Sequence, residues 1–186
     1  MKMKTLALAS IAAFGLVSVA AQATTSTTVV NGGTVHFKGE IVSAACAVDA
    51  GSIDQTVQLG QIRAASLTSG KTSNPVPFNI QLDDCDPTLV TNGVSLIWSG
   101  STVTGNTQAL SVQSTSGATA AATNVGIQIL DPRNTLVTFD NSTATTATKL
   151  TSKTNVLNFK AQYIAVGGDA SAGVANADAS FKVQYQ

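Results

Sequence analysis

The sequence predicts an all-β protein built from two packed sheets. Apolar residues recur at every second position in short runs, which is the periodicity of a half-buried strand. Stretches rich in Ser, Thr, Gly and Asn separate these runs, and no helix of ordinary length is apparent. Each run is apolar on one parity only. Two sheets packed face to face therefore explain the pattern better than a parallel α/β sheet, whose buried strands are apolar throughout.

Short alternating runs give the expected strands in chain order. Their apolar positions are Val35, Phe37 and Ile41; Val57 and Leu59; Val76, Phe78, Ile80 and Leu82; Val94, Leu96 and Trp98; Leu110 and Val112; Val125, Ile127 and Ile129; Leu157, Phe159, Ala161, Tyr163 and Ala165; and Ala177, Ala179, Phe181, Val183 and Tyr185. Asn92-Gly93 and Asp131-Pro132-Arg133-Asn134 favour turns, and residues 62–67 could form one more. Loops are expected at residues 102–107, 114–123 and 141–148.

The first 23 residues have the three parts of a secretory signal peptide. Lys2 and Lys4 are followed by an apolar run over residues 6–20 and by Ala21-Gln22-Ala23, a small-x-small cleavage site. The alternative is a membrane anchor, but the run of roughly 15 residues is shorter than the about 20 that a spanning helix needs. We expect an exported chain that begins at Thr24 and keeps eight basic and ten acidic residues.

Export determines whether the two cysteines are expected to form a disulfide. Outside the cytoplasm an even number of cysteines indicates disulfides, and two allow a single pairing, Cys46 with Cys85. In the loop-entropy model such a bridge contributes about 4 kcal/mol, a large share of a domain's stability of roughly 5–15 kcal/mol. The alternative is a pair of free buried thiols.

The chain carries little equipment for catalysis. Ten basic residues balance ten acidic ones, so nothing indicates nucleic acid as a partner. A closed zinc site needs four nitrogen or sulfur ligands, and the sequence has one His and two Cys. His36 lies on the opposite parity to Val35 and Phe37, so we expect it to face solvent rather than to act as a base.

The acidic cluster of Asp83, Asp84 and Asp86 could in principle bind calcium, which takes several oxygen ligands. Its spacing does not match an EF-hand loop, and no phosphate-binding glycine motif lies between a strand and a helix. We therefore expect no metal, no cofactor and no enzymatic activity.

Three features together resemble pilin subunits of the chaperone–usher pathway, in particular the major subunits of type 1 fimbriae. The exported chain has one Cys pair, and Gly39 stands seven residues before the first Cys within the segment Gly33-x-Val35-x-Phe37-x-Gly39-x-Ile41. The C-terminus reads Ala-Asn-Ala-Asp-Ala-Ser-Phe-Lys-Val-Gln-Tyr-Gln, with Tyr185 penultimate and Gly173 fourteenth from the end. The resemblance covers essentially the whole exported chain and is weakest at residues 99–123.

The resemblance implies an incomplete immunoglobulin-like sandwich that lacks its last strand. It divides the chain into a signal peptide (residues 1–23), a donor-strand extension (24–42) and a pilin domain (43–186). The donor residues it implies are Gly33, Val35, Phe37, Gly39 and Ile41. The acceptor groove and chaperone contacts it implies are Gly173, Ala177, Ala179, Phe181, Val183, Tyr185 and Gln186. Strand addition of this kind, of which donor-strand complementation in pilins is a known instance, uses backbone hydrogen bonds for affinity and side-chain pockets for specificity.

The implied partners are copies of the same chain, a periplasmic chaperone, an outer-membrane usher, and adaptor and adhesin pilins at the tip. The chain would pass through the periplasm to a surface fimbria that supports cell adhesion. A minor adaptor pilin has the same fold and stays open as an alternative. A tip adhesin would need a further lectin domain, for which the 163 residues after the signal peptide leave no room. A secreted enzyme is disfavoured because no catalytic constellation is present.

Overall fold

The computed structural model describes residues 27–114 and 120–186. The predicted signal peptide, residues 1–23, lies outside them. The chain divides into two compact units, Met1–Glu40 and Ile41–Gln186, and the described part of the first is chain without regular secondary structure. Among the described residues no helix has the length and apolar character required to cross a membrane.

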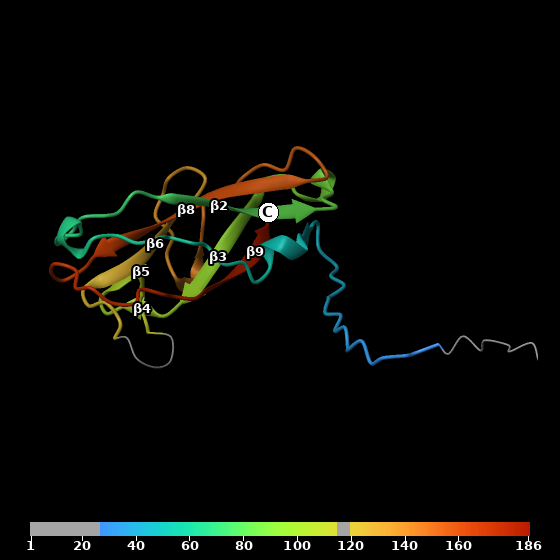
Figure 1. Cartoon of the computed structure of the whole chain (residues 1–186). Helices are drawn as coiled ribbons and strands as arrows, with labels where there is room; N and C mark the ends of the chain where they lie inside the picture. Colours follow the sequence, from blue (N-terminus) through green and yellow to red (C-terminus); the bar gives the residue numbers. More distant parts are fainter. Residues whose placement is uncertain (1–26, 115–119) are drawn as a thin grey trace, which may run out of the picture. The chain divides into compact units, whose positions relative to one another are not determined.

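The second unit is a sandwich of two antiparallel sheets (Figure 1). One sheet has six strands in the order β1-β2-β8-β6-β5-β4, and the other has three in the order β7-β3-β9. The strands are β1 (Ala47–Val48), β2 (Val76–Asp83), β3 (Val94–Gly100), β4 (Thr102–Val103), β5 (Asn106–Ser111), β6 (Val125–Leu130), β7 (Asp140–Ala144), β8 (Asn155–Ala165) and β9 (Ala179–Tyr185). Three 3₁₀ turns accompany them: η1 (Ala50–Ser52), η2 (Ala64–Ser66) and η3 (Pro87–Leu89).

The core lies between the sheets and is formed by the predicted inward parities. Phe78 and Phe159 stack at 5.7 Å between ring centroids, on neighbouring strands of the large sheet. Trp98 of β3 meets Phe159 edge-on at 5.5 Å and Phe181 of β9 at 5.4 Å, so this one indole joins the two sheets. Such aromatic pairs contribute about 0.5–1.5 kcal/mol each beyond the area they bury.

Most predicted strands are confirmed, because their alternation coincides with ladder pairing in β2, β3, β5, β6, β8 and β9. η2 also falls within residues 62–67, where a turn was expected. Two predicted loops are wrong in part. Residues 102–107 contain β4 and the start of β5, and residues 141–148 contain most of β7. β4 and β7 lie at sheet edges, where a strand needs no apolar face, and four of the five β7 residues are exposed.

The strand predicted at Val57 and Leu59 is also wrong, since these residues belong to no ladder. Both are nevertheless half-buried while Gln58 between them is exposed, and Leu59 packs on the main core. The segment therefore has the side-chain alternation of a strand but no hydrogen-bonded neighbour within the described chain. Apolar periodicity records burial on one face and does not register whether a backbone partner exists.

Candidate functional site: a strand edge without a partner

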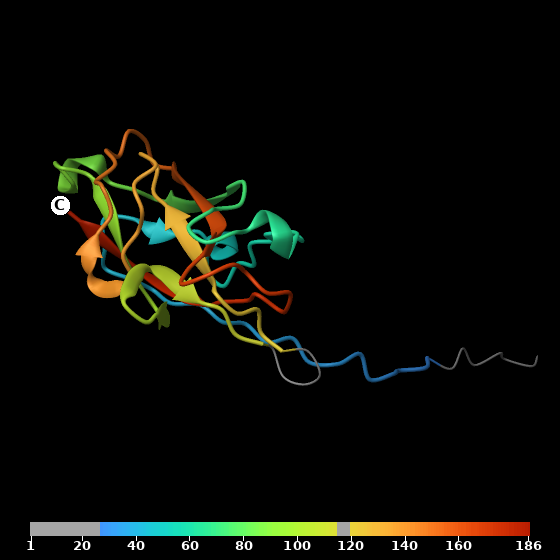
Figure 2. The ribbon, with the colours of Figure 1, turned by 90° about the vertical axis from the view of Figure 1, so that its left-hand side faces the viewer.

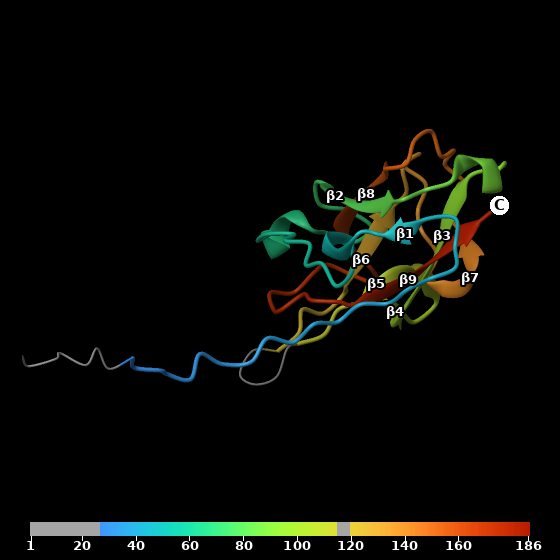
Figure 3. The ribbon, with the colours of Figure 1, turned by 90° about the vertical axis from the view of Figure 1, so that its right-hand side faces the viewer.

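The C-terminal strand β9 forms one edge of the small sheet, and within the described residues it pairs only with β3 (Figure 3). Alternate residues of a strand direct their backbone groups to opposite edges. At the C-terminal end, the amide of Gln186 donates to the carbonyl of Gly93 (3.0 Å) on the β3 side, and the Gln186 carbonyl accepts from the amide of Asn92 (2.9 Å). The even-numbered residues of β9 therefore bond β3, and the odd-numbered ones direct their N–H and C=O groups to the unpaired edge.

The same odd-numbered residues direct their side chains toward the core. Ala177, Ala179, Phe181, Val183 and Tyr185 all pack on the main core cluster, yet each is only half-buried. The residues between them are exposed. The edge of β9 therefore offers unpaired backbone groups and incompletely covered apolar side chains at the same positions, which is the template that an added strand needs.

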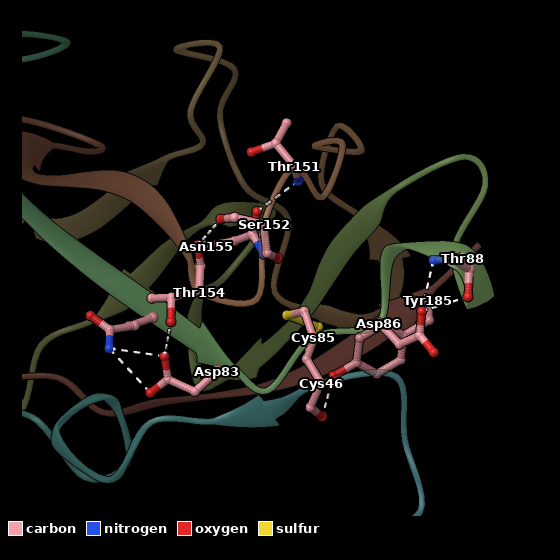
Figure 4. Close-up of a disulfide and its surroundings, with 11 residues drawn as sticks. Cys46, Asp83, Cys85, Asp86, Thr88, Thr151, Ser152, Thr154, Asn155 and Tyr185 are labelled. Atoms are coloured by element: carbon pink, nitrogen blue, oxygen red, sulfur yellow. Dashed lines mark hydrogen bonds between the residues drawn. A yellow bond between two sulfur atoms is a disulfide. The ribbon is translucent and has the colours of Figure 1, made fainter.

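A hydrogen bond fixes the C-terminal end of this edge. The Tyr185 hydroxyl donates to the carbonyl of Cys46 at 2.9 Å, so the last residue of β9 is joined to the chain that enters β1 in the opposite sheet (Figure 4). Partial burial of the ring raises the pKa of Tyr185. Figures 2 and 3 both place the C-terminus beside the turn of η3, in agreement with the Asn92–Gln186 bond.

The disulfide pairs Cys46 with Cys85, as the sequence predicted, and both sulfurs belong to buried residues (Figure 4). Beside it the amide of Asp86 donates to the carbonyl of Ala45 at 2.8 Å. The alternative of two free thiols is thereby excluded. The bridge anchors the chain at the point where the N-terminal extension enters the domain, next to the carbonyl that binds Tyr185.

At the other end of the edge, two segments of the chain pass very close to each other. A Cβ placed on Gly173 would lie 2.4 Å from the Ala122 amide nitrogen, so only glycine fits there. The neighbouring carbonyl of Val174 accepts from that amide at 2.8 Å, and the carbonyl of Asn176 accepts from Gln113. Gly173 lies before β9 rather than in it, and its lack of a Cβ allows the backbone to pass close to Ala122.

A hollow of about 420 Å³ opens at this same end of the edge. Its apolar lining includes Leu67, Val125, Tyr163 and Ala175. The Tyr163 hydroxyl donates to the Ala175 carbonyl at 3.2 Å, and burial raises the pKa of Tyr163. The hollow is therefore a recess with both apolar and polar lining at the entrance to β9, and the sequence alone did not predict it.

The proposed donor segment is exposed along its apolar face. Val35, Phe37 and Ile41 are 74%, 92% and 100% accessible to solvent. Gly39 has no conformational need for glycine, because its φ is not positive, and an added Cβ would meet nothing within 4 Å. Contacts within one chain therefore explain neither the glycine at position 39 nor the exposure of three apolar side chains on one face of the segment.

Two of the three acidic residues near the disulfide, Asp83 and Asp86, have structural partners. Asp83 accepts from the Thr154 hydroxyl at 2.9 Å, and Asp86 caps η3 by accepting from the Thr88 amide at 2.9 Å. The bonds from Thr88 lower the pKa of Asp86. Among the described residues no three His, Cys, Asp or Glu side chains gather as a metal site would require.

These features define a class of protein: an all-β, immunoglobulin-like sandwich with one strand edge unpaired within the described residues, preceded in the sequence by an exposed segment with the apolar alternation of a strand. The family comparison agrees with this class, since the model of the fimbrial protein family matches residues 35–186. The chain belongs to the fimbrial protein family.

Sequence relatives support the assignment over the full length, and solved structures support it over most of the chain. The chain is 52% identical to the type-1 fimbrial protein A chain of Escherichia coli and 52% identical to the fimbrial subunit type 1 of Klebsiella pneumoniae, with 100% of each protein covered. A chain from a chaperone–usher pilus, whose structure reveals the molecular basis of rod uncoiling, superposes with a TM-score of 0.70 at 28% identity. That match covers 87% of this chain and 100% of the other. The P pilus rod subunit PapA gives 0.64 at 29%, covering 77% of this chain and 100% of that one.

Proposed function

We propose that this chain is a structural subunit that polymerises by donor-strand exchange into the shaft of a bacterial surface fimbria. One observation carries the proposal: a single chain has both an unpaired, half-buried strand edge and an exposed segment whose apolar residues match it in parity. Its relatives are fimbrial and rod subunits, which favours the shaft over a minor adaptor position. The family and fold are those of structural pilins, and we assign no catalytic activity.

The energetics favour insertion of the donor segment, residues 24–42. Burying Val35, Phe37 and Ile41 contributes roughly 5–8 kcal/mol before costs, at about 1.5–3 kcal/mol for each side chain. Backbone bonds to the odd-numbered residues of β9 add to this. Gly33 and Gly39 complete the inward parity, and at Gly39 the absent Cβ allows close contact with the groove floor.

The tether disfavours insertion into the same subunit. Only residues 42–45 separate Ile41 from Cys46, which the disulfide holds against β2 and the Tyr185 bond holds against β9. Four residues reach at most about 14 Å. A segment held this close to its own domain reaches the edge of a neighbouring subunit more readily than it can reverse and run along its own β9.

We further propose the assembly partners and route that the family resemblance implies. A periplasmic chaperone would cover the β9 edge first, with Gln186 and the Tyr185 ring and hydroxyl as contacts. An outer-membrane usher would then pass the subunit to the growing fibre, with adaptor and adhesin pilins at the tip. Residues 1–23 would direct export into the periplasm.

Transplanting the donor segment tests this function. Residues 27–42 are removed from the N-terminus and fused behind Gln186 by a flexible linker, so that the chain can complete its own β9 edge. We expect a stable monomer that does not enter fibres, whereas deletion alone gives a chain that cannot extend a fibre. The control carries the transplanted segment with Val35, Phe37 and Ile41 changed to Ser. Fibres formed normally by the deleted chain, seen by electron microscopy, would contradict the proposal.

A further inference from the structure

The apolar alternation of the donor segment leaves its register on β9 open. A shift of one residue would turn the apolar face outward, but a shift of two residues keeps every apolar side chain inward. This question rests on the proposed function, because it arises only if residues 33–41 pair with the β9 edge of another subunit. Every strand pair of both sheets is antiparallel, so we take the added strand to be antiparallel as well.

The outward residues of the two strands carry the charges that distinguish these registers. Even-numbered residues of β9 bond β3, so toward an added strand they occupy non-hydrogen-bonded positions, where opposed Cα atoms are about 4.5 Å apart. Opposite charges in such pairs stabilise a sheet and like charges destabilise it. On the donor the outward residues are Thr34, His36, Lys38 and Glu40, and along the acceptor they are Asn176, Asp178, Ser180, Lys182 and Gln184; all are exposed.

Four registers set Lys38 opposite a residue at or after Asp178, namely Asp178, Ser180, Lys182 or Gln184, and two of these four bring like charges together. Lys38 opposite Ser180 places Glu40 against Asp178. Lys38 opposite Lys182 opposes two cations directly. Both registers are disfavoured on charge alone.

The other two registers each form an ion pair. Lys38 opposite Asp178 opposes two unlike charges and sets Glu40 against Asn176 and His36 against Ser180. Lys38 opposite Gln184 instead sets Glu40 against Lys182. Charge therefore leaves two candidates, and apolar burial has to decide between them.

Burial favours the register with Lys38 opposite Asp178. All five inward donor residues then have a partner on the acceptor, with Phe37 over the small Ala179 and Ile41 over Ala175, which lines the 420 Å³ hollow. In the alternative, Phe37 and Ile41 lie opposite the bulky Tyr185 and Phe181, and the hollow at Ala175 stays uncovered. Burying Ile41 at the hollow outweighs the difference between two exposed ion pairs.

We infer that Lys38 of one subunit pairs with Asp178 of the next, and that this ion pair acts together with burial of the inward apolar residues to fix the register of the inserted strand. The Asp178 carboxylate is positioned for this, since its Oδ2 accepts from the Gln113 side-chain amide at 3.2 Å. That bond holds the carboxylate on the outer face at the entrance to β9. Lys38 belongs to the exposed extension, so its substitution leaves the packing of the domain unchanged.

Charge reversal in full-length chains tests the pair. Fibres are assembled in cells from chains carrying Lys38→Asp, Asp178→Lys, or both, and their dissociation rate in denaturant is measured at low and high salt. We expect each single variant to dissociate about three- to tenfold faster than the unchanged fibre at low salt, and the double variant to recover most of the loss. High salt should narrow the differences, because these charges are exposed. Asp178→Asn, which keeps a side chain able to bond Gln113, controls for local folding and should give an intermediate rate.

A second pair of reversals tests the competing register. Glu40→Lys combined with Lys182→Glu should show no mutual rescue if Lys38 faces Asp178. Rescue in this pair, or strictly additive effects of Lys38→Asp and Asp178→Lys, would overturn the inference while leaving strand exchange intact. Failure of the proposed function has a different signature, since fibres would then form without residues 27–42.

Discussion

The hydroxyl of Tyr185, at the end of β9, donates to the carbonyl of Cys46 at 2.9 Å and so joins the last strand of one sheet to the residue that precedes β1 of the other. Cys46 is itself bonded to Cys85, two residues beyond the end of β2. The Tyr185 hydroxyl thereby connects the unpaired edge of β9 to Cys46. The disulfide fixes Cys46 in place, and the donor extension precedes it in the sequence.

Replacing Tyr185 by Phe tests this connection. The variant keeps the ring and loses one hydrogen bond, so we expect the free energy of unfolding to fall by about 0.5–1.5 kcal/mol. Tyr163→Phe is the matched control, because it loses a bond to the Ala175 carbonyl at the opposite end of the edge. Denaturant unfolding with amide exchange at Gln186 distinguishes them: only Tyr185→Phe should accelerate that exchange. Equal exchange in both variants would show that the Tyr185 bond does not hold the C-terminal end.

Alkaline pH should weaken the fold through the same two tyrosines. Burial raises the pKa of Tyr163 and of Tyr185 above the ordinary value of about 10. The unfolded chain therefore loses these protons first, so their contribution is complete below about pH 10 and declines as pH rises through the folded-state pKa values. Unfolding midpoints between pH 8 and pH 11 should fall less steeply in a Tyr163→Phe/Tyr185→Phe double variant. An identical slope in that variant would refute the assignment.

Gly39 should be required by the assembled fibre and not by the domain. Gly39→Val adds a branched side chain where the inserted strand meets the groove floor, so we expect fibre assembly to be slowed at least tenfold, the effect of about 1.4 kcal/mol. Gly32→Val is the control, since a Cβ at Gly32 also meets nothing within 4 Å and its parity directs the side chain outward. Electron microscopy over an assembly time course compares the two. Wild-type kinetics for Gly39→Val would place Gly39 outside the groove.

Removing the disulfide should cost more than any of these single changes. Replacing Cys46 and Cys85 together by Ser is expected to lower the free energy of unfolding by about 2–5 kcal/mol. The loss should be accompanied by faster exchange at Tyr185, because the carbonyl that this tyrosine binds belongs to Cys46. Unfolding of the oxidised, reduced and double-Ser chains measures the effect. A melting temperature unchanged in reductant would contradict a stabilising role.

The sequence predicts the core strands well and the edges poorly, for a physical reason. Runs such as Ile80 and Leu82 lie between two layers, so burial imposes strict alternation. β7 is exposed, so its residues carry no apolar pattern. Polar contacts mark its start instead: hydrogen bonds from the Thr143 hydroxyl and from the amides of Thr143 and Ser142 lower the pKa of Asp140 to about 2. Val57 and Leu59 show the opposite case, since they alternate without a ladder partner.

The site was predictable only in part. The apolar parities of residues 33–41 and 177–185 can be read from the sequence, and the structure adds that the β9 edge is unpaired within the described chain. The Tyr185–Cys46 bond, the close approach at Gly173 and the hollow at Ala175 join residues far apart along the chain. No local pattern encodes such contacts, because they depend on how the two sheets are placed against each other.

Amide hydrogen exchange along β9, in unassembled chain and in fibres, tests the central claim most directly. Ser180, Lys182 and Gln184 bond β3 within the subunit, so their amides should exchange slowly in both states and serve as internal controls. The amides of Phe181, Val183 and Tyr185 should exchange fast in the unassembled chain and slowly in the fibre, where another subunit supplies the missing strand. Fast exchange of these three amides in the fibre, or full protection before assembly, would contradict the account.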